Sequence, residues 1–262
     1  MTRVLSALVL LPIVIGAVWF LPPVATLVLA LIAAVLSFAE YVTIAAALGA
    51  SVPRAVPGAA VLGACAAIGR GWAVVDVVLM TALITIGAVA VASGRPGPDV
   101  LRNAAAALFP IVYIGLPLGA LAAVRVLGGR EAVLLLMATI VISDSAQYYT
   151  GRAFGRRPLS PTISPKKTVE GAVGGLVFGT LAFVAGARFV FTGAPMLLVT
   201  LVGASIAALG IVGDLFESLL KRSAGVKDSG ALIPGHGGVL DRIDSWLFAA
   251  PMYYVFVRYL SF

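Results

Sequence analysis

Long apolar segments separated by short polar loops constrain this chain more than any other feature. A helix crosses a bilayer when it holds about 20 mostly apolar residues, and nine candidate segments follow one another along the 262 residues. They are Val4–Phe20, Val24–Leu48, Gly58–Gly69, Val74–Ala92, Ala104–Val124, Ala132–Tyr149, Gly171–Phe191, Pro195–Leu220 and Ser245–Leu260. Only 11% of the residues are charged, and a soluble core could not hide so much apolar surface. The sequence therefore predicts an all-α, polytopic transmembrane helical bundle of about nine spans.

The acidic residues are concentrated in the second half of the chain. Seven of the eleven lie from Asp144 onward, mostly at span ends or in two basic loops. Carboxylates near membrane segments are costly and usually functional. We therefore expect residues 1–130 to form a hydrophobic transmembrane scaffold and residues 131–262 to form the catalytic region.

The 18 lysines and arginines give a net charge of +7 and lie in short loops between the apolar segments. With the N-terminus in the cytoplasm and nine alternating spans, most of them fall on the cytoplasmic side, as the positive-inside rule requires. A nucleic-acid partner would need basic residues clustered on a soluble face, so we expect none. The predicted location is the cell inner (cytoplasmic) membrane, with the lipid bilayer as a partner. The two basic loops, and any active site that they form, are expected to face the cytoplasm.

Any bound metal must be held mainly by oxygen atoms. Cys65 and His236 are the only residues of their types, which excludes multi-thiolate and multi-histidine sites. Oxygen ligands favour a hard ion such as Mg²⁺.

The end of the eighth apolar segment carries one polar helix face. Asp214, Glu217, Ser218 and Lys221 are spaced i, i+3, i+4 and i+7, so in a helix they share a side. The alternative is a polar helix end stabilised by a Glu217–Lys221 pair, with Arg222 near the negative end of the helix dipole. That alternative explains the basic residues but not Asp214, which lies deeper in the span.

A glycine-rich loop and two further acidic residues follow. The stretch around His236 has glycines that let a backbone approach a phosphate, although His236 could equally be a loop hydrogen-bonding residue. Asp241 and Asp244 are i, i+3 neighbours, so both carboxylates can point at one ion. Asp244 is equally suited to cap the following helix, whereas Asp241 favours the metal interpretation.

The other basic loop contains the adjacent Lys166 and Lys167, downstream of Asp144. Paired lysines are point charges that suit a polyphosphate. Attraction to anionic lipid headgroups is the alternative, and it explains Arg156 and Arg157 better than it explains the lysines.

These segments together resemble the phosphatidate cytidylyltransferase family. The similar residues are Ser218-Leu-Leu-Lys221-Arg222, Lys227-Asp228, and the run from Ile233 through His236 and Asp241-Arg242 to Asp244. The stretches Ser143-Asp144 and Ser164–Gly171 resemble the family as well. The similarity is specific in the C-terminal half, and the N-terminal spans share only their hydrophobicity.

The resemblance implies a membrane nucleotidyltransferase of phospholipid biosynthesis, which converts CTP and phosphatidate to CDP-diacylglycerol and pyrophosphate. The implied catalytic residues are Asp214, Ser218, Lys221 and Asp241, and the implied Mg²⁺ ligands are Asp214, Asp241 and Asp244. The implied substrate-binding residues are Asp144, Lys166, Lys167, Arg222, Lys227, Asp228, His236 and Arg242. A homodimer is compatible with this pattern.

Three other function classes fit the sequence less well. A CTP-using polyprenol or phytol kinase is disfavoured by the full signature from Ser218 to Asp244. A transporter with intramembrane aspartates often shows repeated halves and midplane broken helices, whereas here the polar residues gather at one edge. A CDP-alcohol phosphotransferase is disfavoured because its D-G-x-x-A-R motif is missing.

Overall fold

The computed structural model describes residues 12–72, 74–94, 96–230 and 237–260. Within these residues, six helices are long and apolar enough to cross a membrane. They are Pro23–Ala47, Val75–Ala92, Asp99–Leu127, Gly129–Phe154, Val169–Val190 and Met196–Ser223. The predicted all-α, multi-pass membrane architecture is confirmed, and the expected total of nine spans is compatible with it.

The remaining predicted spans differ in length from the expectation. The third segment forms α3 (Ala55–Gly69), which at 15 residues is shorter than a typical span. The ninth forms α10 (Leu240–Val255) followed by a π-helical turn at Phe256–Leu260. Of the first predicted span, residues 12–20 are helical, and its start lies outside the described residues.

The helices group into two compact units. The first unit comprises Met1–Val126 and Leu220–Arg242, and the second comprises Leu127–Leu219 and Ile243–Phe262. The functional division expected at residue 130 is not tested by this packing. The packing does place residues 220–242 with the N-terminal helices.

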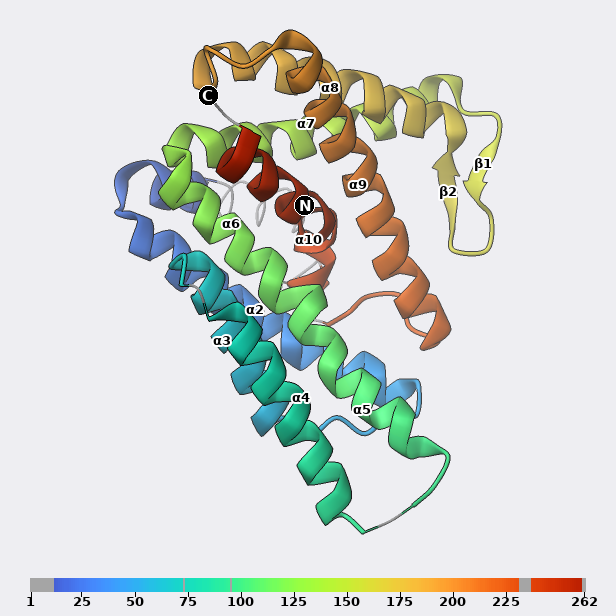
Figure 1. Ribbon diagram of the computed structural model, residues 1–262. Helices are drawn as coiled ribbons and strands as arrows, with labels where there is room; N and C mark the ends of the chain where they lie inside the picture. Colours follow the sequence, from blue (N-terminus) through green and yellow to red (C-terminus); the bar gives the residue numbers. More distant parts are fainter. Residues whose placement is uncertain (1–11, 73, 95, 231–236, 261–262) are drawn as a thin grey trace. The chain divides into compact units, whose positions relative to one another are not determined.

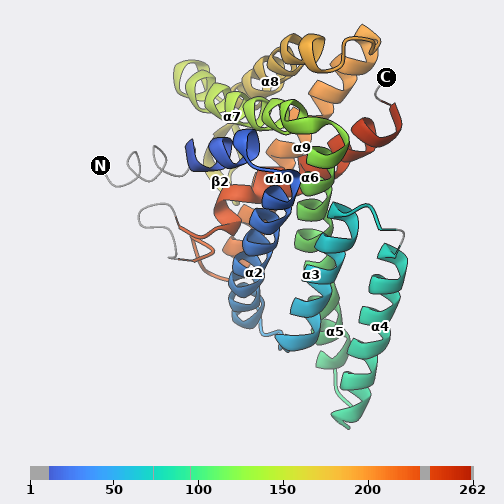
Figure 2. The same cartoon turned by 90° about the vertical axis from the view of Figure 1, so that its left-hand side faces the viewer.

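In the first unit, α2 (Pro23–Ala47), α3, α4 (Val75–Ala92), α5 (Asp99–Pro110) and α6 (Leu116–Leu127) form a helical bundle. Figure 2 shows α3 and α4 running side by side. Many large apolar side chains of α4 are exposed, including Met80 and Ile84, which suits a helix whose surface faces lipid. A π-helical turn at Ile111–Gly115 joins α5 to α6. It follows Pro110, which lacks the N–H needed to continue the α-helical ladder.

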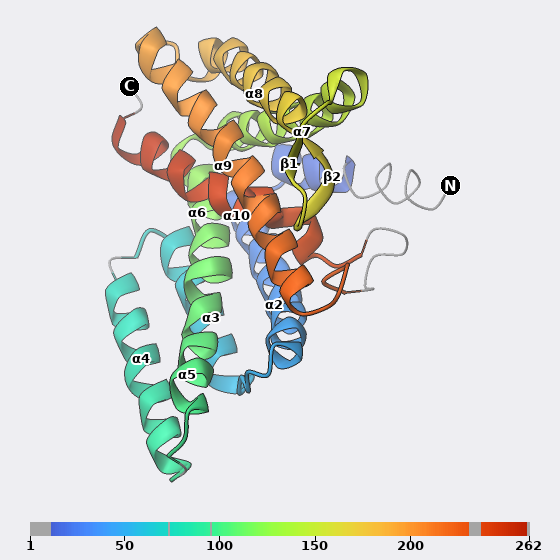
Figure 3. The same cartoon turned by 90° about the vertical axis from the view of Figure 1, so that its right-hand side faces the viewer.

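In the second unit, α7 (Gly129–Phe154) and α8 (Val169–Val190) lie side by side (Figure 3). Gly171, Gly175 and Gly179 recur every four residues and so share one face of α8. Side chains at these three positions would approach α7 atoms of Gln147 and Ser143 within 3 Å. Small residues are what allow membrane helices to pack this closely.

A short antiparallel hairpin connects α7 to α8, as Figure 1 shows in yellow. It consists of β1 (Pro158–Ser160) and β2 (Ser164–Thr168). The prediction of an all-helical chain did not include it, because the segment is too short and polar to show strand periodicity. The unit is completed by α9 (Met196–Ser223) up to Leu219 and by α10 from Ile243. Its core includes the buried rings of Phe183, Tyr253 and Phe256.

Candidate active site

The loop that carries the two adjacent lysines is fixed at the start of α8. The Thr168 hydroxyl accepts a hydrogen bond from the Gly171 amide at 3.1 Å, which satisfies one of the amides left free at a helix N-terminus. The Glu170 carboxylate accepts from the backbone amides of Arg156 and Arg157 at 3.0 and 3.2 Å. The basic loop is therefore held to α8 at several points.

The strand geometry separates the two lysines. Successive side chains on a strand point to opposite faces, and Lys166 is exposed whereas Lys167 Nζ lies 2.5 Å from Asp214 Oδ2 of α9. The side chains of Lys167 and Asp214 are 22% and 30% exposed, so water screens this ion pair less than it screens a surface pair. An ammonium group carries three donors, so Lys167 keeps hydrogens for a second acceptor.

Asp144 of α7 and Ser218 of α9 complete this cluster in the second unit. The Asp144 carboxylate accepts from Gln147 Nε2 at 3.0 Å, and the charges of Asp214 and Lys167 both act on it. The Ser218 hydroxyl donates to Asp214 Oδ1 over a long 3.4 Å. With both carboxylates ionised, Asp144 and Asp214 would carry one more negative charge than Lys167 neutralises. This surplus, together with the oxygen ligands, suits a further hard cation such as Mg²⁺.

A second cluster, in the first unit, is built around Asp241. Its side chain is 6% exposed and that of Lys221 is 11% exposed. The Lys221 ammonium donates to Asp241 Oδ1. Asp241 Oδ2 accepts from the Ser229 amide at 2.9 Å, the Ser229 hydroxyl at 2.9 Å and the Gly238 amide at 2.8 Å. The carboxylate therefore holds the loop between α9 and α10 at both of its described ends.

These donors keep Asp241 ionised. Burial raises the pKa of the Asp241 carboxyl, but the hydrogen bonds from Lys221, Gly238 and Ser229 outweigh burial and hold the pKa below its ordinary value. At neutral pH the group is a carboxylate, the form in which it binds cations.

Glu40 of α2 reaches the same loop, and the sequence interpretation missed it. Its carboxylate accepts from the amides of Val239 and Leu240 at 2.8 Å each. Its Oε2 also lies 3.0 Å from the Ser229 hydroxyl, whose single hydrogen is shared between Glu40 and Asp241. The available signal was an acidic residue inside an otherwise apolar segment, which is a functional indication on its own. The N-terminal spans were instead treated as scaffold.

A family model described as the cytidylyltransferase family matches residues 1–260. The chain belongs to this family. The family membership predicted from the signature is therefore confirmed, and the match extends over the N-terminal spans, which the signature alone did not reach.

Curated relatives agree with this assignment. The chain is 42% identical over 158 residues to a phosphatidate cytidylyltransferase from Helicobacter pylori, an alignment that covers 59% of this chain and 58% of the relative. It is 38% identical over 172 residues to one from Thermotoga maritima, covering 62% of each chain. It is also 44% identical over 136 residues to the uncharacterized protein YnbB of Escherichia coli, covering 52% of this chain and 45% of the relative. The chain thus spans about half to three fifths of the length of these relatives.

The structure brings together two sets of the predicted site residues of this cytidylyltransferase family member. Asp144, Lys167, Asp214 and Ser218 meet in the second unit, and Lys221 and Asp241 meet in the first. The remaining predicted site residues are Lys166, Arg222, Lys227, Asp228, His236, Arg242 and Asp244. Apart from the half-buried Asp244 and from His236, which lies outside the described residues, these side chains are exposed.

The metal assignment stays a prediction. Within the described residues, no group of three or more His, Cys, Asp or Glu side chains is arranged to hold a metal ion. The Asp244 carboxylate accepts from the Ser245 amide at 2.6 Å. Because α10 begins at Leu240, Asp244 lies inside the helix and does not cap it, so the capping alternative is wrong. For Asp214 and Asp241 as ligands, replacement of each by Asn is the test.

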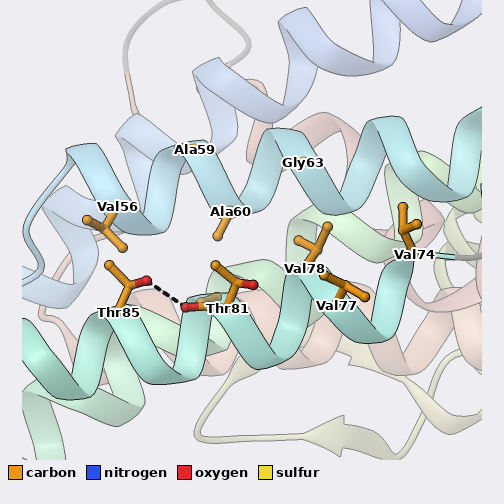
Figure 4. Close-up of a pocket in the computed structure, with 10 residues that line it drawn as sticks. Val56, Ala59, Ala60, Gly63, Val74, Val77, Val78, Thr81 and Thr85 are labelled. Atoms are coloured by element: carbon orange, nitrogen blue, oxygen red, sulfur yellow. Dashed lines mark hydrogen bonds between the residues drawn. The ribbon is translucent and has the colours of Figure 1, made fainter.

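An apolar cavity of about 470 Å³ lies between α3 and α4. Figure 4 shows Val56, Val78 and other small apolar side chains facing the space between the two helices. Of its two threonines, Thr85 donates its hydroxyl hydrogen to the Thr81 carbonyl at 2.7 Å. None of the residues lining this cavity is charged, so we place no phosphate-bearing substrate there.

Proposed function

We propose that this protein is an integral membrane enzyme that transfers the cytidylyl group of CTP to phosphatidate, giving CDP-diacylglycerol and pyrophosphate. The observation that carries the proposal is the partly shielded Lys167–Asp214 pair beside Asp144. It combines a polyphosphate-binding ammonium with carboxylates suited to a metal ion. Family membership and the named function of the relatives support the same reaction.

The reaction needs positioning and charge neutralisation rather than a side-chain nucleophile. An oxygen of the phosphatidate phosphate attacks the α-phosphorus of CTP, and the bond from that phosphorus to the bridging oxygen of the β-phosphate breaks. Pyrophosphate leaves with the electron pair of that bond. Lys167 would bind triphosphate oxygens through the donors that Asp214 does not use, and Lys221 and Arg222 would bind phosphates at the end of α9.

Mg²⁺ is part of the proposal. Asp214 would hold it beside Asp144, and Asp241 and Asp244 remain predicted ligands. Bound there, the ion would neutralise charge on the phosphoryl oxygens and act as a Lewis acid. The surplus negative charge of Asp144 and Asp214 over Lys167 supports this placement.

We further propose that the basic loops face the cytoplasm from the inner membrane. Two candidate spans, α8 and α9, separate the loop before α8 from the loop after α9, so both loops emerge on one side. Their concentration of Lys and Arg favours the cytoplasmic side. CTP would then arrive from the cytosol while phosphatidate remains in the leaflet.

The test is an assay of detergent-purified protein with CTP, phosphatidate and Mg²⁺. Label in the α-phosphate of CTP should appear in CDP-diacylglycerol only when all three are present, and the matched Asp214→Asn enzyme should produce none. Transfer of γ-phosphate label to a polyprenol or phytol, with no product from phosphatidate, would instead identify a lipid kinase and refute the proposal.

A further inference from the structure

Glu40 is an acidic residue in the apolar helix α2, and it is 9% exposed. A carboxylate at such a position is costly unless its oxygens accept hydrogen bonds. The oxygens of Glu40 do accept them, and among the described residues their donors come from the loop and helix that carry the family signature.

Two of the donors are the amides at the start of α10. The Val239 amide donates to Glu40 Oε1 and the Leu240 amide donates to Oε2, both at 2.8 Å. Because α10 begins at Leu240, these amides have no acceptor within the helix. The negative charge also lies at the positive end of the helix dipole. A carboxylate about 200 residues away in sequence therefore caps α10.

The third donor links Glu40 to Asp241. The Ser229 hydroxyl lies 3.0 Å from Glu40 Oε2 and 2.9 Å from Asp241 Oδ2. Asp241, the second residue of α10, is fixed in turn by Lys221. Any shift of Glu40 therefore acts on Asp241 both through Ser229 and through the start of the helix.

The loop backbone closes tightly around the Glu40 carboxylate. A Cβ atom at Gly238 would lie 2.4 Å from Glu40 Oε2, and one at Gly230 would lie 2.9 Å from Oε1. The glycines of this stretch thus serve close packing around a buried carboxylate, in addition to any approach to a phosphate.

We propose that Glu40 is a positioning residue for the transferase reaction, which holds Ser229 and the first turn of α10 so that Asp241 and Lys221 keep their orientation. The inference rests on the proposed function for its catalytic part, while its structural part can be measured without any activity.

The test is Glu40→Gln, which preserves size but replaces one acceptor oxygen by an NH₂ group. Whichever way the amide turns, at least one of the two α10 amides loses its acceptor. In detergent-purified protein we expect kcat to fall at least tenfold, with KM for CTP changing less than threefold. Hydrogen–deuterium exchange in peptides covering residues 237–243 should become at least tenfold faster.

Ser37→Ala is the matched control. Ser37 lies one turn earlier on α2, is fully buried and has no hydrogen-bond partner for its hydroxyl among the described residues. This variant should keep wild-type kcat and wild-type exchange. If Glu40→Gln protein does not accumulate in the membrane, Glu40→Asp makes the same test, because the shorter side chain withdraws its oxygens from the α10 amides, and the same two changes are expected.

The outcomes separate the two proposals. Wild-type protein without transferase activity refutes the proposed function, and the exchange experiment still tests the capping by Glu40. Unchanged exchange in the variant refutes the positioning role. Faster exchange with unchanged kcat also refutes it, because the cap would then be structural only.

Discussion

Replacing Lys167 by Met should weaken the use of CTP more than the use of phosphatidate. Met has similar length and removes the charge, and with it any contact from the ammonium to the triphosphate. One charge-assisted hydrogen bond contributes about 1.5–3 kcal/mol. Because the Lys167 side chain is only 22% exposed, solvent screening reduces this contribution only in part. At 1.36 kcal/mol per factor of ten, kcat/KM for CTP should fall about 10- to 150-fold.

The assay varies CTP at saturating phosphatidate and then phosphatidate at saturating CTP, in mixed micelles. We expect KM for phosphatidate to change by less than about threefold. Arg188→Ala removes an exposed cation at the other end of α8 and should leave both parameters unchanged. Lys166→Ala should also weaken CTP use, but less, because Lys166 is exposed on the opposite face of β2. Kinetics within twofold of wild type for Lys167→Met would show that this loop binds only lipid headgroups.

Three further predictions concern the metal ligands, the topology and the helix packing. Asp214→Asn and Asp241→Asn should each purify normally yet lose nearly all turnover at any Mg²⁺ concentration; near-normal activity in either would remove that residue from the ligand set. Single cysteines at Thr162 and Ser223, both exposed, should resist an impermeant thiol reagent in intact cells and react in inverted vesicles, and the reverse pattern would overturn the cytoplasmic orientation. Gly175→Ala should lower stability in detergent by about 1–3 kcal/mol through overpacking, and an unchanged melting temperature would contradict the close helix contact.

The sequence was sufficient for the membrane architecture because hydropathy and length decide which segments can span. It was less informative about local irregularities. The π-helical turn after Pro110 and the hairpin before α8 depend on a few backbone hydrogen bonds, and these leave no periodic pattern in the sequence. Hydropathy also does not mark where a helix ends in polar residues. The expected span Ala104–Val124 is therefore only part of the observed helix, Asp99–Leu127.

For the site, the signature identified most of the residues but not their partners. Both lysines of the basic loop were predicted to act alike, and only the strand conformation separates Lys167 from Lys166. The contacts of Glu40 join residues about 190 to 200 positions apart, a distance at which spacing along the chain carries no information. The one available indication was the cost of placing an acid within an apolar segment.

The glycine-lined contact between α7 and α8 has a consequence for how the protein is made. These two helices and the hairpin between them precede α9 in the chain, so they leave the ribosome first. At Gly171 and Gly175 the contact meets only atoms of α7 and of the segment before α8, whereas Gly179 also faces Ala207 of α9. The first part of the contact can therefore form during insertion, before α9 is synthesised. Lys167 would then already be held on β2 when Asp214 of α9 enters the membrane. The Lys167–Asp214 ion pair would form last, with a lysine whose position is already set.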